Sequence, residues 1–251
     1  MITFKAYFKK EIMESKRQYK YIILAVGIIA FAILNPFMLK LLPKILEQQL
    51  KGDLSSLFVS TPKAAINEYI KSLFQIGTLF IIFTLGSSLN EEINEEKLVF
   101  PYSKGIAPAG IVLAKIIHYT IVVTILTFIG FFTCDYYGSI LFLGEKVSLS
   151  GILNSAFLMS VYYFFNITLV TLFSSIVRKG VTAGFITVMI TFSSAAFVNI
   201  PAIGKFMPYK LVEGANSFTL ENYLYTMVFL IIFSILFIII TIIKMNKVEV
   251  V

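Results

Sequence analysis

The sequence is poor in the side chains that most enzymes use for chemistry. Its 251 residues include one histidine, one cysteine and no tryptophan, and charged residues make up only 14% of the total. A single histidine excludes an H-E-x-x-H metal site, and a single cysteine, Cys134, excludes an internal disulfide and a cysteine cluster for zinc. The G-x-S-x-G and G-x-x-x-x-G-K-[ST] patterns are also absent. We therefore expect no catalytic site, no metal and no cofactor bound by this chain.

What the sequence has instead is long apolar stretches. Hydrophobic residues make up 58% of the chain, against ~45–50% in ordinary globular proteins. A hydrocarbon core of ~30 Å needs about 20 apolar residues, and backbone in lipid must be helical. Six stretches meet this length: 21–39, 73–89, 111–132, 152–177, 181–200 and 223–243. We predict an all-α polytopic membrane protein, with one transmembrane domain over residues 1–251.

The distribution of basic residues predicts the orientation. The net charge is +7, and most of the basic residues fall on the cytoplasmic side if the N-terminus is cytoplasmic. The positive-inside rule therefore favours both termini in the cytoplasm. The lysines of the first outside loop argue the other way, but the N-terminal basic cluster and the tight Arg178-Lys179 turn outweigh them.

The first twenty residues are too charged to form a span. Apolar side chains recur near helical spacing, with lysines off that stripe: Phe4, Phe8, Ile12 and Tyr19 against Lys5, Lys9, Lys16 and Arg17. This pattern predicts an amphipathic helix over residues 1–20 that lies in the membrane interface. A solvated basic leader is the alternative.

Proline and glycine divide the rest of the chain. Pro36 is expected to bend or end the first span. Ser60-Thr61-Pro62 predicts a helix start, with a hydroxyl cap and a proline in the first turn. The cytoplasmic loop 90–110 contains two prolines and is expected to hold only a short helical piece. The extracellular loop 201–222 is apolar, so we expect it to dip into the membrane or to pack on the bundle.

Ionisable side chains are almost absent from the spans. His118 lies within an apolar run, and a neutral imidazole bonded to a neighbouring helix is favoured over a proton relay. The remaining candidates are uncharged and share helix faces, and they could serve helix packing or line a pathway. They are Gln75 and Thr78 in the second span, and Thr187, Thr191 and Ser194 in the fifth.

The loop 90–110 and the start of the third span carry a recognisable pattern. An acidic start is followed by Ser103-Lys104, Ile106 and a hydrophobic run that ends at Lys115. With the basic leader and six spans, this pattern resembles the ABC-2 type permeases, and most of all the compact Gram-positive permeases that export antimicrobial peptides and phenol-soluble modulins. The chain departs from the family pattern at Gly105, Ala107 and Pro108.

The resemblance implies a function and partners. Two permeases, a homodimer rather than a heterodimer, would form a path through the bacterial plasma membrane for an amphipathic peptide, a drug or a lipid-like substrate, and nucleic acid is not expected. Each permease would bind a separate ATPase subunit, which holds the ATP and Mg²⁺. The expected contact is a coupling helix with Glu95, Glu96, Lys97, Tyr102, Ser103 and Lys104. Spans two and five would line the path, which favours the pathway role for the polar residues above.

Two other functions stay open at this point. The chain could be an immunity or sensor protein of the membrane that binds a peptide without any ATPase. A secondary transporter would need a buried ion site, and the sequence offers only His118 with no carboxylate inside an apolar run.

Overall fold

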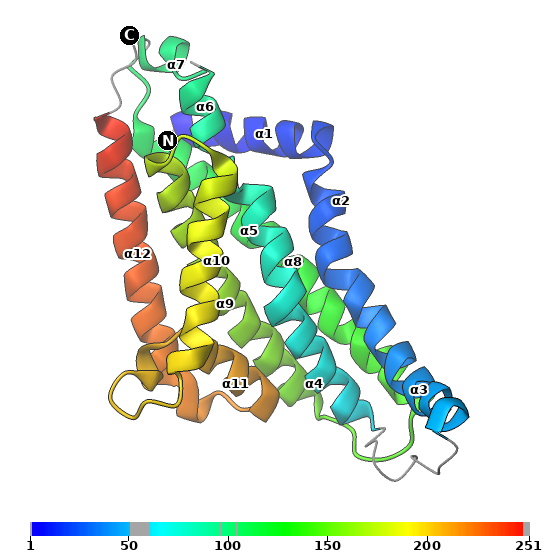
Figure 1. Ribbon diagram of the computed structural model, residues 1–251. Coiled ribbons are helices and arrows are strands. Elements are labelled where there is room, and N and C mark those ends of the chain that lie inside the picture. Colours follow the sequence, from blue (N-terminus) through cyan, green and yellow to red (C-terminus); the bar gives the residue numbers. More distant parts are fainter. Residues whose placement is uncertain (1, 51–60, 96, 104, 248–251) are drawn as a thin grey trace.

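The computed structural model describes residues 2–50, 61–95, 97–103 and 105–247. Within these ranges the chain is helical and forms no strand, which confirms the expected all-helical fold. Figure 1 shows long helices side by side, with one helix, α1 (Ile2–Arg17), running across an end of the bundle.

The described residues contain six helices that are long and apolar enough to cross a membrane, as expected. They extend over Lys20–Pro43, Pro62–Asn94, Pro108–Leu141, Leu149–Ile176, Gly180–Phe197 and Glu221–Asn246. Four consist mainly of one element: α8 (Pro108–Leu141), α9 (Leu149–Ile176), α10 (Gly180–Phe197) and α12 (Leu224–Asn246). The chain is therefore built as a multi-pass membrane protein.

The first two spans each contain a π-helical turn. The first consists of α2 (Lys20–Ala25), η1 (Val26–Ala30) and α3 (Phe31–Leu50). The second consists of α4 (Pro62–Ser72), η3 (Leu73–Gly77) and α5 (Thr78–Gly86), and it is followed by α6 (Asn90–Asn94). Tyrosine hydroxyls from other helices donate to carbonyls in both π turns. The Tyr69 hydroxyl lies 3.2 Å from the Ile28 oxygen, and that of Tyr163 lies 3.0 Å from the Leu73 oxygen.

Helix α9 forms the centre of the bundle. It packs against α8, α12, α10, α5 and α11 (Tyr209–Ser217), and side chains around its whole circumference are buried. The outer helices expose large apolar side chains such as Ile129, Phe185 and Ile235. An apolar outer surface on helices of this length is suited to lipid.

Two local signals in the sequence had different outcomes. The Thr61 hydroxyl accepts a hydrogen bond from the Ala64 amide at 3.1 Å, and Pro62 opens α4, so the predicted helix start is confirmed. Pro36 does not end the first span, because α3 continues helically beyond it. Proline is tolerated in membrane helices where neighbouring helices support the backbone. Here the Asn35 side chain binds the Ser72 hydroxyl at 2.9 Å.

The two ends of the bundle differ. Helices α1, α6 and α7 (Val99–Ser103) and the C-terminal end of α12 lie at one end, and α11 lies at the other (Figure 1). The short α6 and α7 fit the expectation of short helical pieces within 90–110. Helix α11 packs on the bundle, where the Ser155 hydroxyl donates to the Ala215 carbonyl at 2.6 Å, as expected for the loop 201–222.

Candidate functional site

A cluster of charged side chains lies inside the end of the bundle where α1, α6 and α8 meet. We call it the buried charge cluster. It consists of Lys10, Glu11, Glu14, Lys20, Glu92 and Lys115. Charged groups without water are stable only when they are paired and hydrogen-bonded. The contacts within the cluster therefore determine how these helices are held together.

Lys115 is the centre of the cluster. Its side chain is 1% exposed, and its ammonium lies 2.6 Å from a Glu11 oxygen and 3.2 Å from a Glu92 oxygen. Lys10 also binds the same oxygen of Glu92. One lysine of α8 thus connects α1 to α6, and residues separated by about a hundred positions in the sequence meet at one point.

A set of hydroxyl groups and an imidazole adjoins the cluster. The Ser15 hydroxyl donates to the Tyr119 hydroxyl at 3.1 Å and lies 3.3 Å from His118 Nε2. The Tyr21 hydroxyl lies 3.2 Å from the same nitrogen. His118 is thus hydrogen-bonded to neighbouring helices, in agreement with the favoured interpretation of this residue.

The charges in the cluster balance. Glu11, Glu14 and Glu92 bring oxygens within 4.8 Å of one another, but Lys10, Lys20 and Lys115 each lie within ion-pair distance of one of these carboxylates. A metal ion at this point would add positive charge to a site that is already neutral. The arrangement therefore suits an internal ion-pair lock better than a metal centre.

The face of α1 that is buried in the bundle carries polar residues, which the apolar stripe did not predict. Tyr7, Glu11 and Ser15 are the buried residues, whereas Ile12 is 41% and Tyr19 67% exposed. Tyr7 lies close to the cluster, and burial together with the Glu92 carboxylate raises its pKa to about 12. Helix α1 is therefore held to α8 partly by polar contacts.

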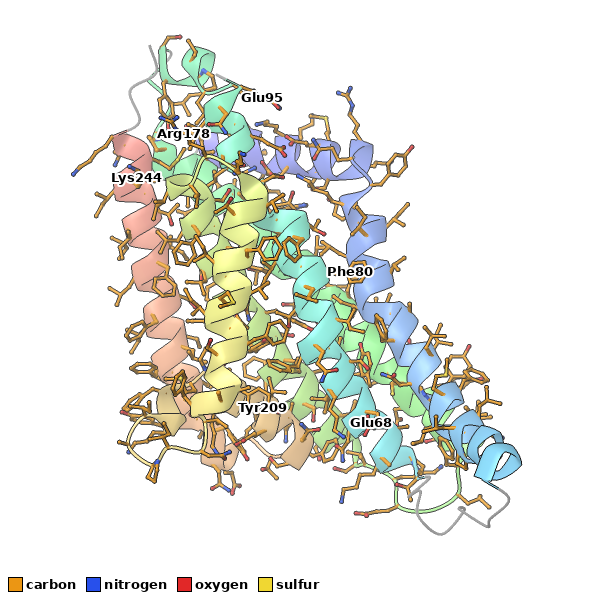
Figure 2. All side chains as sticks on the ribbon, viewed as in Figure 1. Glu68, Phe80, Glu95, Arg178, Tyr209 and Lys244 are labelled. Atoms are coloured by element: carbon orange, nitrogen blue, oxygen red, sulfur yellow. The ribbon has the colours of Figure 1, made fainter. Side chains whose placement is uncertain are left out.

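Those residues predicted for an ATPase contact that the structure describes lie at the same end as the cluster. Figure 2 shows Glu95 with Arg178 and Lys244 at this end, and Glu68 and Tyr209 at the other. Lys97 pairs with Glu95, which raises the pKa of the lysine above its usual value. The predicted contact residues Glu96 and Lys104 lie outside the described residues.

Tyr102 connects α7 to the last span. Its hydroxyl donates to the Met245 carbonyl on α12 at 3.3 Å. Burial and the Glu92 carboxylate raise the pKa of Tyr102 to about 12. Ser103 ends α7 and is exposed.

The residues predicted for a substrate path are mostly enclosed within the single chain. Thr187, Thr191 and Ser194 are buried on α10, and the Thr191 hydroxyl donates to Asn166 of α9 at 2.6 Å. Thr78 is buried and lies 3.2 Å from the Tyr162 hydroxyl, whereas Gln75 is exposed. In this chain the stripe lies at a helix interface, and its role along a pathway stays a prediction.

Sequence reasoning did not identify Glu11 and Glu92 as buried, and it described ionisable groups in the spans as almost absent. One signal was available. Lys115 lies inside an apolar run, and a lysine at such a position needs a carboxylate partner. Its partners are distant in the sequence, so only the fold identifies them.

Comparisons with known proteins give no relative. No protein-family model, no curated protein and no solved structure matches the chain.

Proposed function

We propose that this chain is the membrane-spanning subunit of an ABC-2 type exporter in a bacterial plasma membrane. Both termini and the α6–α7 segment are cytoplasmic in this proposal, and α1 lies in the membrane interface. Two copies form a path for an amphipathic peptide, a drug or a lipid-like molecule. A separate subunit binds and hydrolyses ATP with Mg²⁺. The resemblance in the loop 90–110 suggests this function, and the anchoring of α6 and α7 is the observation that supports it most.

The segment that would receive the ATPase is attached to three other helices by specific contacts. Glu92 of α6 binds Lys115 of α8 and Lys10 of α1, and Tyr102 of α7 binds the backbone of α12. A docking segment can change the arrangement of spans only if its movement is passed on through contacts that differ between states. These contacts provide such a connection.

The test is co-purification with an ATPase. The chain is co-expressed with a candidate ATP-binding subunit from the same genome, and vanadate-sensitive ATPase activity of the complex is measured in nanodiscs. We expect Tyr102→Ala and Lys104→Ala to lower the activity while the protein stays folded. Lys210→Ala is the matched control, because Lys210 pairs with Glu213 on α11 at the other end of the bundle.

Equal activity in all three variants would remove the coupling role of α6–α7. A folded protein that binds no ATPase would contradict the exporter proposal and favour a solitary immunity or sensor protein.

One observation favours a second candidate, an ion-coupled transporter. The sequence offered no carboxylate near His118, but Glu11 binds Lys115, one helical turn from His118 on α8. Transport that stops when the proton gradient is collapsed at constant ATP would support this candidate. The balanced charges of the cluster argue against it, since each carboxylate is already neutralised by a lysine.

A further inference from the structure

The second span is interrupted close to its end, and the local sequence does not require the interruption. Helix α5 ends at Gly86 and α6 begins at Asn90, yet residues 87–94 include neither proline nor glycine. The backbone on both sides is nearly helical. The angles φ and ψ are −87° and −4° at Ser87 and −100° and −37° at Leu89, against about −63° and −42° in an α-helix. Helices α5 and α6 are therefore close to forming one continuous helix.

A serine of α9 holds the interruption in place. The first amides of a helix need an acceptor from outside it, usually the side chain of the residue just before the helix. Leu89 stands at that position of α6, and its side chain cannot accept a hydrogen bond. The fully buried Ser174 hydroxyl accepts instead, from the amides of Leu89 at 3.0 Å and Asn90 at 3.2 Å. In a continuous α-helix these two amides would bind the carbonyls of Leu85 and Gly86.

The end of α5 is fixed, whereas α6 is held by few contacts to α9 and the turn that follows it. A Cβ on Gly180 would lie 2.6 Å from the Ser87 Cα, so the start of α10 packs directly on the end of α5. The last residue of α6, Asn94, donates from its side chain to the Arg178 carbonyl at 2.6 Å. A change at the interruption therefore moves α6 rather than α5.

The side chains at the interruption do little to stabilise it. Ser88 Oγ and Asn90 Nδ2 are buried, and neither has a hydrogen-bond partner among the residues that the structure describes. A buried polar group without a partner destabilises the arrangement that contains it. The position of α6 against α9 therefore depends on the Ser174 hydroxyl.

We propose that residues 87–89 form a two-state switch between a broken and a continuous helix, and that Ser174 stabilises the broken state. In the continuous state the amides of Leu89 and Asn90 bind the helix's own carbonyls, and Asn94 leaves Arg178. Each backbone amide has an acceptor in both states, which keeps the two close in free energy. Glu92 is nearer the interruption than Asn94, so α6 moves least where it binds Lys115. The switch belongs to this chain alone and holds or fails independently of the proposed ATPase.

The test measures how often α6 lies against the turn after α9. Nitroxide labels are attached to Asn94→Cys and Arg178→Cys, which are both exposed, and the dipolar broadening of their spectrum in nanodiscs gives the fraction of close pairs. Cys134 is fully buried and stays unlabelled while the protein is folded. Replacing Asn94 also removes the second attachment of α6, so that Ser174 alone holds the broken state.

The decisive comparison uses two neighbouring serines. Ser174→Ala should lower the ratio of close to distant pairs roughly 2- to 30-fold, the change expected from the loss of a helix cap. Ser175→Ala should leave the ratio unchanged, because the buried Ser175 hydroxyl donates only to the Leu172 carbonyl of its own helix, at 2.6 Å. An unchanged ratio in Ser174→Ala, or an equal change in both variants, would overturn the proposal.

Hydrogen exchange distinguishes a continuous helix from a frayed one. In Ser174→Ala without added cysteines, the amides of Leu89 and Asn90 should stay protected, because the carbonyls of Leu85 and Gly86 accept their hydrogen bonds. Fast exchange of these two amides together with a loss of close pairs would show fraying and would overturn the continuous state. Protection of Cys134 from a thiol reagent in the same variant shows that the bundle is folded.

Discussion

Replacing Lys115 by methionine should destabilise the protein strongly. Methionine has a similar length but no charge, so the variant removes the ammonium between Glu11 and Glu92 and largely preserves the side-chain volume. Glu92 retains Lys10 as a partner. Glu11 retains no ion-pair partner among the described residues, although it is only 1% exposed. The variant therefore leaves a carboxylate buried and unpaired.

The expected loss follows from this burial. Removing one partner of a buried pair costs about 3–5 kcal/mol, whereas an exposed pair contributes about 0–1 kcal/mol. The chain provides a matched control in Lys63, which lies 2.8 Å from Glu145 with side chains 40% and 69% exposed. Lys63→Met makes the same chemical change at a similar distance, so the two variants differ mainly in burial.

The assay uses the single cysteine. Cys134 is fully buried, so its reaction with a thiol-specific fluorophore reports unfolding during titration with a denaturing detergent. We expect Lys115→Met to lower the free energy of unfolding by about 3–5 kcal/mol and Lys63→Met by less than about 1 kcal/mol. The double variant Glu11→Gln/Lys115→Met should lose less than Lys115→Met alone, because no buried charge is left unpaired at Glu11.

Two results would refute this reasoning. If Lys115→Met and Lys63→Met lose the same small free energy, water or a rearranged side chain compensates the buried carboxylate. The single variant Glu11→Gln completes the comparison. If the double variant loses as much free energy of unfolding as Glu11→Gln and Lys115→Met lose together, Glu11 and Lys115 do not interact energetically.

Three further predictions use the same unfolding assay. Thr61→Ala should lower the free energy of unfolding by about 0.5–2 kcal/mol, because it removes the cap of α4; no change would show that the cap is not needed. Gly86→Ala should lower the free energy of unfolding by about 1–3 kcal/mol, because the added Cβ would lie 2.7 Å from the carbonyl oxygen of Gly180 in α10. Gly138→Ala is the control and should lower it less, because the nearest atom to a Cβ there is 3.6 Å away. Tyr102 has its pKa raised from 10.0 to about 12, so the stability that it contributes is complete below pH 10 and is lost between pH 10 and pH 12. Tyr102→Phe should reduce the loss between pH 10 and pH 12, and an unchanged loss would contradict this assignment.

The spans could be predicted from the sequence because membrane insertion depends on local composition. About twenty apolar residues in a row are sufficient to predict a helix, and each expected span corresponds to one helix of the structure. The start of α4 was predictable for a similar reason, since Thr61 caps an amide only three residues away. The continuation of the span past Pro36 could not be predicted, because the effect of a proline depends on neighbouring helices, and here Asn35 binds Ser72 of α4.

The candidate site could not be predicted in the same way, because it depends on contacts between distant residues. Glu11 meets Lys115 from 104 positions away, and Glu92 meets Lys10 from 82 positions away. Periodicity shows which face of one helix is apolar, but it does not show which helix packs there. On α1 the apolar stripe was predicted to face the membrane, and the burial of Glu11 against the bundle could not be inferred from it.

The position of Lys115 limits how this end of the protein can move. Because the Lys115 ammonium of α8 binds Glu11 of α1 and Glu92 of α6, movement of either helix away from α8 must break a buried ion pair. Breaking the pair leaves an uncompensated buried charge, at a cost of several kcal/mol. Movement of α1, α6 and α8 as one unit leaves the pairs intact and is therefore favoured. A partner that displaces α6 without breaking these pairs therefore also displaces α1 and α8.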